Sequence, residues 1–201
     1  MSLIARLTEK SWESRPAAPE TDRPPAAKVL LILYFGVAVV LFGLVTSAYL
    51  MRMGMPGMAH GPMGSWRPLP EPPLLWVNSG VLMLASIAWE GARIGARGDR
   101  PLGWGIAAGL LGLLFLLGQL LLWRQLVDAG HGMRGDPAAA FFYLITALHG
   151  LHVLGGLYFW ARAMLAVRGE GNAALRFQLT AAYWHFLLLV WLLMLGLFVA
   201  T

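Results

Sequence analysis

The feature that most constrains this chain is a set of five long apolar runs that contain no charged residue. They are 18 to 25 residues long and cover 29–51, 72–89, 101–123, 137–161 and 177–201. About 20 apolar residues in an α-helix cross the hydrocarbon core of a bilayer. None of the runs shows the ten-residue alternation of a transmembrane strand. The sequence therefore predicts an all-α membrane protein with five transmembrane helices in one bundle.

The expected helices make up a single domain, 28–201, because no period repeats along the chain and no linker divides it. The preceding segment, 1–27, is polar and contains four prolines, so we expect a disordered or interfacial cytoplasmic tail. The chain has no cysteine, which excludes disulfides and thiolate metal sites. The predicted helices cover about 29–51, 74–93, 102–124, 138–161 and 176–200.

The basic residues predict how the bundle is oriented in the membrane. Eleven of them precede the first expected helix or lie between helices two and three or four and five. The other side has four, Arg52, Arg67, Arg124 and Arg134. Cytoplasmic loops of membrane proteins carry an excess of Lys and Arg. We therefore expect the N-terminus in the cytoplasm and the C-terminus outside.

Three histidines lie deep inside the expected helices, His149 and His152 in the fourth and His185 in the fifth. Polar rings at that depth are costly, so they are functional or critical for assembly. The rings could converge, and three imidazoles would suit zinc or copper. However, no further ligand stands at membrane depth to complete or orient such a site. We expect hydrogen-bonded histidines between helices, with a metal site, a haem or a proton relay as alternatives.

Three other polar side chains lie within or near the ends of the expected helices. Asn78 and Gln119 lie at similar depths in the second and third helices, which predicts a hydrogen bond between their amides. Glu90 lies at the cytoplasmic end of the second helix. We expect it to reach water or to pair with Arg93, three residues later.

Glycines mark two faces where helices could approach closely. Gly105, Gly109 and Gly112 follow one another at helical spacing in the third expected helix, which predicts tight contact with a neighbour. Gly36 and Gly43 lie two turns apart in the first helix and predict a similar approach there.

At these residues the chain resembles subunit III of the heme-copper oxidases, the cytochrome c and quinol oxidases. Four segments carry the resemblance, in the order in which the family has them: 74–79, 112–119, 146–153 and 183–191. The five-helix layout is similar to that of members without the two N-terminal helices of the seven-helix form. The resemblance marks as structural residues Asn78, Gln119, Thr146, His149, His152, Tyr183, Trp184 and His185.

What the resemblance implies is an accessory subunit of a respiratory terminal oxidase in the bacterial cytoplasmic (inner) membrane. Such a subunit has no catalytic residue and binds no cofactor, because haems and copper belong to partner subunits. Its main partner is subunit I, with subunit II and small subunits nearby and no nucleic acid. It binds phospholipid and supports proton uptake and the stability of subunit I. The alternatives are an accessory protein of a nitric oxide reductase or other respiratory complex, and a small free-standing transporter.

The chain departs from the family at three positions. Members usually carry acids where Ala38, Leu122 and Leu188 stand here. A buried carboxylate is costly unless it is paired, so without these acids the three deep histidines should stay neutral. We expect them to bond only to backbone, hydroxyl or amide groups. A carboxylate or metal within reach of any of them would contradict this. The departures also put support for proton uptake in question.

The segment after the first expected helix is rich in soft metal ligands. It contains five thioethers and one imidazole in thirteen residues, a set that resembles Cu(I) sites. Transient copper binding is one hypothesis, and methionines that pack adaptably on a partner or lipid are the alternative. The residues are Met51, Met53, Met55, Met58, His60 and Met63.

Overall fold

The computed structural model describes residues 25–54, 69–96, 101–133, 137–167 and 173–200, and the regular elements in these ranges are all α-helices. Each helix is long and apolar enough to cross a membrane, which confirms the five predicted spans. The predicted tail, 1–27, lies almost entirely outside the described residues. The helices are α2 (Ala26–Met53), α3 (Pro73–Gly95), α4 (Leu102–Asp128), α5 (Pro137–Ala166) and α6 (Ala173–Ala200).

Local sequence signals fix some of the helix ends. α3 begins with Pro73 in its first turn, where a missing amide hydrogen removes no helical hydrogen bond. Gly130, two residues after the last helical residue of α4, terminates that helix with a φ of 87°, a conformation that glycine adopts readily. The N–H of Gly130 bonds to Val127 O at 3.0 Å, and the N–H of His131 bonds to Leu126 O at 2.9 Å. This pair of bonds satisfies carbonyl groups that the helix end would otherwise leave unpaired.

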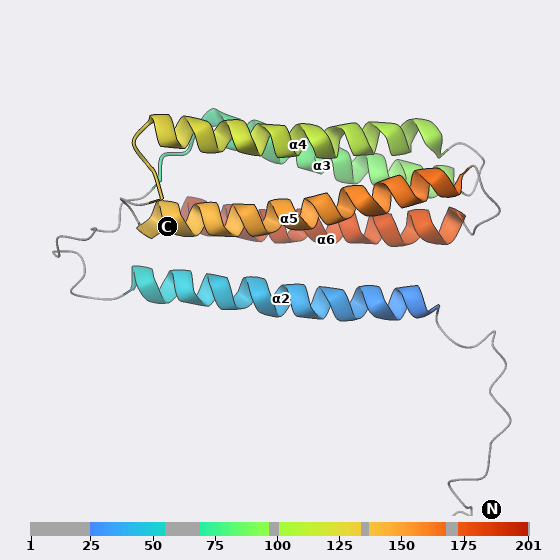
Figure 1. Ribbon diagram of the computed structural model, residues 1–201, viewed down its shortest axis with the longest axis horizontal. Helices are drawn as coiled ribbons and strands as arrows, with labels where there is room; N and C mark the ends of the chain where they lie inside the picture. The colour runs from blue at the N-terminus through green and yellow to red at the C-terminus, as the bar shows by residue number, and fades with distance from the viewer. Residues whose placement is uncertain (1–24, 55–68, 97–100, 134–136, 168–172, 201) are drawn as a thin grey trace, which may run out of the picture.

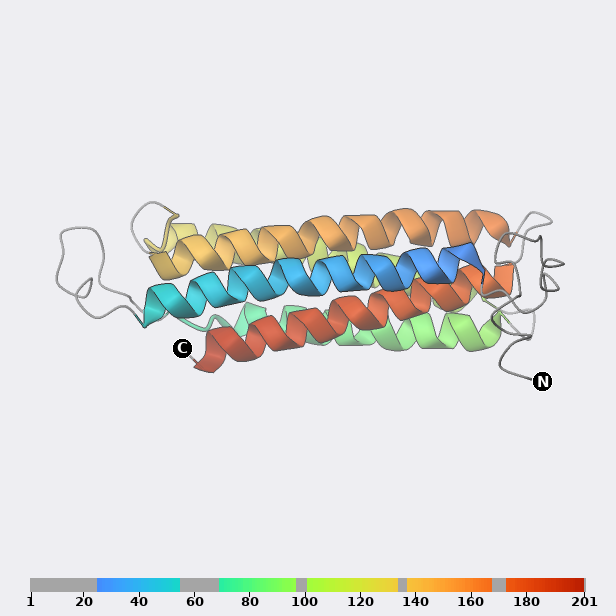
Figure 2. The same cartoon turned by 90° about the horizontal axis from the view of Figure 1, so that it is seen from below.

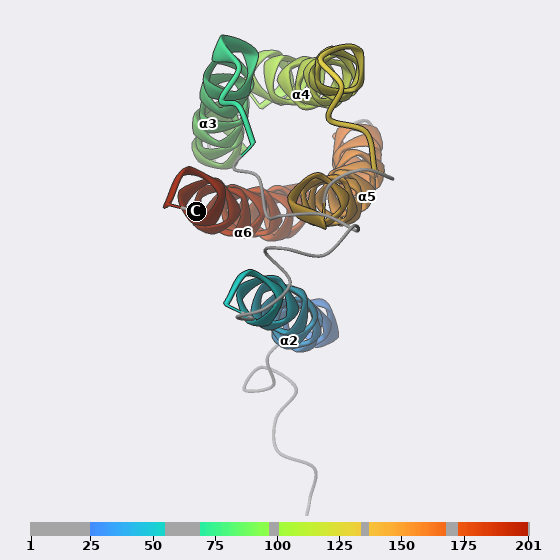
Figure 3. The same ribbon diagram turned by 90° about the vertical axis from the view of Figure 1, so that its left-hand side faces the viewer.

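Helices α3, α4, α5 and α6 form a four-helix ring, and α2 lies outside it, against α5 and α6 (Figure 1, Figure 3). Successive helices run antiparallel, so α2, α4 and α6 start at the same end of the bundle (Figure 2). We call this end the basic end, because it holds Lys28, Arg93, Arg162 and Arg176.

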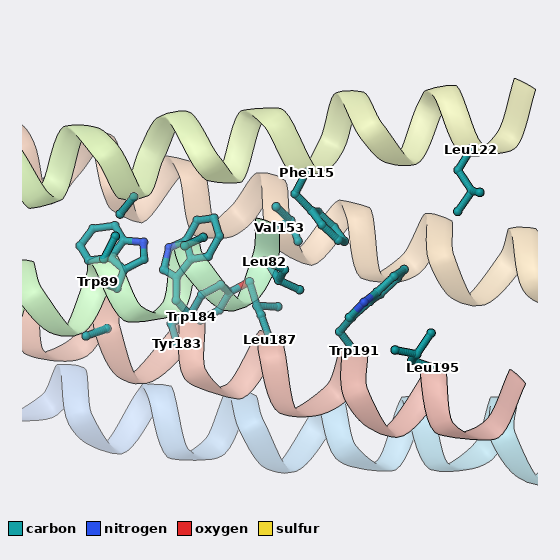
Figure 4. Packing of buried hydrophobic residues seen from close by; sticks show 14 of the residues in the cluster. Leu82, Trp89, Phe115, Leu122, Val153, Tyr183, Trp184, Leu187, Trp191 and Leu195 are labelled. Atoms are coloured by element: carbon teal, nitrogen blue, oxygen red, sulfur yellow. The ribbon is translucent and has the colours of Figure 1, made fainter. Parts of the chain in front are cut away.

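Large aromatic side chains fill the ring (Figure 4). The indoles of Trp89 and Trp184 are fully buried and stack with ring centroids 6.1 Å apart. Further along the bundle, Phe115 meets Trp191 edge to face at 5.0 Å. Helices in lipid associate mainly through close van der Waals contact and interhelical hydrogen bonds. These interlocking rings therefore supply much of the contact that holds α3, α4 and α6 together.

The glycine face of α4 makes the close contacts that the sequence predicts. A Cβ atom added at Gly112 would collide with the Trp184 ring, and one at Gly109 would collide with the Trp160 ring. Trp160 also donates a hydrogen bond from Nε1 to the carbonyl oxygen of Gly105, at 2.8 Å. The small residues of α4 thus make room for indole rings from α5 and α6, which confirms this prediction.

Helix α2 is attached differently, through one face that carries aromatic side chains. Its buried residues are Ala38, Phe42 and Tyr49, and Phe42 packs in a small second cluster with Ile145. Gly36 and Gly43 lie outside this contact, with no atom of the described residues within 4 Å of an added Cβ. The predicted close approach at these two glycines is therefore wrong within this chain, because α2 turns them away from α5 and α6.

Candidate functional site

The three deep histidines point to different neighbours, so they form no common site. His149 and His152 on α5 lie among rings of α2, α4 and α6, whereas His185 on α6 meets side chains of α3. Among the described residues, no group of three His, Cys, Asp or Glu side chains is placed to hold a metal ion. The convergence considered from the sequence does not occur. That the chain binds no cofactor stays a prediction.

His149 is fully buried in an aromatic cage. Its ring lies 5.1 Å from that of Trp191, 5.8 Å from that of Phe115 and 6.5 Å from that of Phe42. Neither ring nitrogen has a hydrogen-bond partner among the described residues. The predicted hydrogen bond of this histidine is therefore wrong within the part of the chain described. The cause is local: the side chains that face the ring from α2, α4 and α6 are aromatic, and the indole N–H of Trp191 bonds elsewhere.

His152 follows the prediction of a backbone partner. Its Nδ1 lies 2.7 Å from the carbonyl oxygen of Leu148, one turn earlier in α5. Its own carbonyl oxygen accepts a 2.7 Å hydrogen bond from the hydroxyl of Tyr183. The hydroxyl of Tyr34 lies 3.0 Å from that of Tyr183. Because the Tyr183 proton is already donated to His152, Tyr34 is the donor of this second bond. The chain of hydroxyls ties α2 to both α5 and α6.

The prediction that the deep histidines have no carboxylate partner is wrong for His185. Its Nδ1 lies 2.5 Å from the hydroxyl of Ser86, as expected for a hydroxyl partner, but its Nε2 lies 3.4 Å from a carboxylate oxygen of Glu90. Glu90 also accepts two hydrogen bonds from Arg93, which confirms that predicted pair. Side chains on a helix lean toward its N-terminus. Glu90 therefore leans away from the basic end and reaches His185, near the middle of α6.

A set of side-chain bonds between α3, α4, α5 and α6 accounts for most of the remaining motif residues. Asn78 Nδ2 donates to Gln119 Oε1 at 3.4 Å, which confirms the predicted amide pair, although Gln119 Nε2 has no partner among the described residues. The indole of Trp191 donates to Ser79 Oγ at 2.9 Å, and that of Trp123 donates to Thr146 Oγ1 at 3.0 Å. These bonds fix the register of the ring helices against one another.

The three positions without the family's acids lie in or against the core. Leu122 is fully buried and Ala38 is nearly so, while Leu188 is partly buried against the core. Ala38 stands one turn from both Tyr34 and Phe42, whose rings contact that of His152. An acid at Ala38 would thus be on the face of α2 that meets this histidine, but the surroundings here are apolar and aromatic.

A pocket opens between α2, α5 and α6 at the basic end, with a volume of about 560 Å³. Its walls are mainly apolar and include Leu30 and Leu31 of α2. Arg162 and Arg176 lie at its mouth near the helix ends, and Tyr34 and Tyr183 line it further in. Sequence reasoning missed this pocket. It also missed Ser86, although the four-residue spacing from Glu90 places both on one face of α3.

The methionine-rich segment is mostly outside the described residues. Met51 and Met53 end α2 with exposed side chains, whereas Met55, Met58, His60 and Met63 are not described. Copper binding there stays a prediction.

The sequence of the chain can be compared with those of known proteins. Over 182 residues the chain is 31% identical to a cytochrome c oxidase subunit 3 of Synechocystis sp., a match that covers 85% of this chain and 74% of the relative. It is 28% identical over 167 residues to a cytochrome bo(3) ubiquinol oxidase subunit 3 of Pseudomonas aeruginosa, covering 80% and 78%. No protein-family model matches the chain.

A shorter and more similar match is a probable cytochrome c oxidase subunit 3 of Mycobacterium tuberculosis, 38% identical over 94 residues. It covers 44% of this chain and 45% of the relative, so the chain spans less than half the length of this protein. The longer matches extend the similarity over most of the five helices. This integral membrane protein belongs to the heme-copper oxidase subunit III family.

Proposed function

We propose that this chain is an accessory subunit of a respiratory heme-copper terminal oxidase and binds no redox cofactor itself. The observation that carries the proposal is its family membership, supported by similarity to subunits of both cytochrome c and ubiquinol oxidases. In this proposal the haems and copper belong to partner subunits. Subunit I is the main partner, and this chain stabilises it and supports its proton uptake.

The fold supports an accessory role more than a free-standing transporter. Transporters commonly have discontinuous helices whose ends face a site at the middle of the membrane. Within the described residues, each of the five helices runs unbroken from end to end. No second function is therefore proposed.

The proposed orientation has the basic end at the cytoplasmic face of a bacterial inner membrane and Ala200 near the outer face. The distribution of Lys and Arg supports it, because cytoplasmic loops are enriched in both. With this orientation, the pocket between α2, α5 and α6 opens at the level of the cytoplasmic headgroups.

In this proposal the pocket holds a phospholipid. Arg162 and Arg176 supply guanidinium groups at the mouth, where a phosphate can accept charge-assisted hydrogen bonds. The apolar walls, including Leu30 and Leu31, suit an acyl chain that runs between α2 and α6. A lipid at this place adds contact area between α2 and the ring. It would thereby strengthen the attachment of α2 to the ring, which the protein alone makes through few side chains.

Co-purification tests the proposal. The tagged chain, extracted from its native membrane in mild detergent, is expected to bring down a larger membrane subunit and the absorption spectrum of a haem-containing oxidase. Recovery of the chain without any haem protein would contradict the proposal. Deletion of the chain should leave the haem spectrum in place while the oxidase loses activity faster during turnover.

A further inference from the structure

The polar cluster of Glu90, Arg93 and His185, here called the triad, lies on the surface of the chain and not in its core. The side chains of Glu90, Arg93 and His185 are 37%, 27% and 45% exposed. Apolar residues flank them at helical spacing along α3 and α6, and this whole surface is called the triad face. The flanking residues are Met83, Ile87, Ile94, Leu189 and Leu192, all exposed.

The triad lies at membrane depth. At about 1.5 Å per residue, Glu90 is about 8 Å from the basic end of α3 and His185 about 18 Å from that of α6. Arg93 is nearer the basic end, and a free arginine there could extend toward water. Instead, its Nε and Nη2 are both bonded to Glu90, which turns the guanidinium back along α3, away from the basic end. The cluster is therefore held below the headgroup level.

Lipid acyl chains cannot solvate the polar groups of this surface. Hydrocarbon offers no hydrogen-bond acceptor, and ionisable groups in membrane proteins face protein or a water-filled cavity. His185 is hydrogen-bonded to Ser86 through one ring nitrogen and to Glu90 through the other, so these polar groups have partners within the chain. The bonds of Arg93 to Glu90 use its Nε and Nη2, and within the part of the chain described no acceptor is found for its Nη1 amine. The surface thus fits a protein partner that brings an acceptor at this depth.

We propose that the triad face is the docking surface for a transmembrane helix of another subunit, which presents a carboxylate or carbonyl oxygen to Arg93. The inference rests on the proposed function and adds which face of the chain meets its partner. The exposed face of α4 provides the contrast. Leu110, Leu114 and Leu117 are exposed there and no polar side chain accompanies them, which suits lipid.

The test uses spin labels, which the chain suits because it has no cysteine. Ile87→Cys reports on the triad face and Leu110→Cys on α4. Both positions are eight residues from the basic end of their helices, and the native side chains are 61% and 59% exposed. Each labelled complex is purified through a tag on this chain, with the wild-type chain as the background. Mobility and accessibility to dissolved oxygen are then measured in a bilayer.

The label at position 87 is expected to be immobile and shielded from oxygen, and the label at 110 to be mobile and accessible. Equal mobility and accessibility at both positions, with the haem-bearing partner present, would overturn the docking proposal and leave the proposed function standing. Dipolar coupling between two labels at position 87 would identify a second copy of this chain as the occupant and would also overturn it. A chain that purifies without a haem protein would overturn both proposals.

A variant gives a second readout. Arg93→Gln is expected to lower the fraction of chain retained on its partner after a detergent wash by about tenfold, the effect of one well-placed interface residue. Arg124→Gln, at the opposite end and highly exposed, is the matched control and should retain the wild-type fraction. Equal retention of the two variants would contradict the role given to Arg93.

Discussion

Helix α2 and the four-helix ring are both apolar enough to span a membrane, yet they are buried to very different degrees. Three of the 28 residues of α2 are buried, against ten of the 28 in α6. Hydrophobicity therefore does not decide which helix is enclosed, because lipid is as apolar as the core. What distinguishes the ring is complementary shape: glycines of α4 receive indole rings, while the glycines of α2 face outward.

The largest expected effect comes from removing the central indole of the ring. Trp184→Ala should destabilise the chain by about 3–5 kcal/mol, because it deletes a fully buried aromatic side chain. Unfolding in mixed micelles with increasing denaturing detergent would measure the loss. Trp76→Ala is the control, since that side chain is half exposed, and it should change the transition little. Equal losses would show that the ring does not depend on this core.

A pair of glycine substitutions compares the packing of the glycine face of α4 with that of α2. Gly112→Ala adds a Cβ that collides with the Trp184 ring and should cost about 1–3 kcal/mol. Gly36→Ala meets no atom of the described residues and should be neutral or slightly stabilising, because alanine is the better helix former. The same unfolding assay measures both. If Gly36→Ala proved the more harmful in the isolated chain, the assigned roles of the two faces would be wrong.

The hydroxyl of Tyr34 is expected to matter for α2 and not for the ring. Tyr34→Phe removes its bond to Tyr183 and should weaken the attachment of α2 by about 0.5–1.5 kcal/mol. Hydrogen exchange should speed up in α2 while the amides of α3 and α4 keep their rates. Tyr158→Phe, on an exposed ring, is the matched control. Faster exchange throughout the chain would mean that α2 and the ring unfold as one unit.

A similarly small effect is expected for the lipid between the two regions. Arg176→Gln should weaken the retention of an anionic phospholipid by about 1 kcal/mol, the contribution of one basic residue near a charged membrane surface. Native mass spectrometry of the purified complex would report the bound lipid. Arg124→Gln, far from the pocket, should retain as much lipid as the wild type. If both variants held equal amounts, the lipid would not be bound through Arg176.

The helices, and the contacts that depend only on how deep a residue lies in the membrane, could be predicted from the sequence. Charge-free length predicts the spans, equal depth predicts the bond between Asn78 and Gln119, and a three-glycine face predicts the tight side of α4. These features need only the position of a residue along its own helix. They hold whichever way the helices are arranged around the ring.

Features that depend on how each helix is rotated could not be predicted. The three histidines could have converged, but α6 turns His185 toward α3 while α5 turns His149 into the aromatic cage. The position of Glu90 along its helix predicted a carboxylate at the water-exposed helix end. This prediction did not take into account that the side chain tilts toward the helix N-terminus and therefore toward the middle of the membrane. The pocket combines residues from three helices, so no single stretch of sequence carries its signal.

The role of the buried histidines is tested most directly by the haem and metal content of this chain after separation from its partners. The complex is purified through this chain, dissociated in detergent, and each fraction is examined by its haem spectrum and by elemental analysis. Iron and haem are expected to stay with the larger subunit, this chain is expected to carry neither, and His149→Phe is expected to leave the haem content of the complex unchanged. Haem or stoichiometric iron on the separated chain, lost in His149→Phe, would contradict the claim that its buried imidazoles serve assembly.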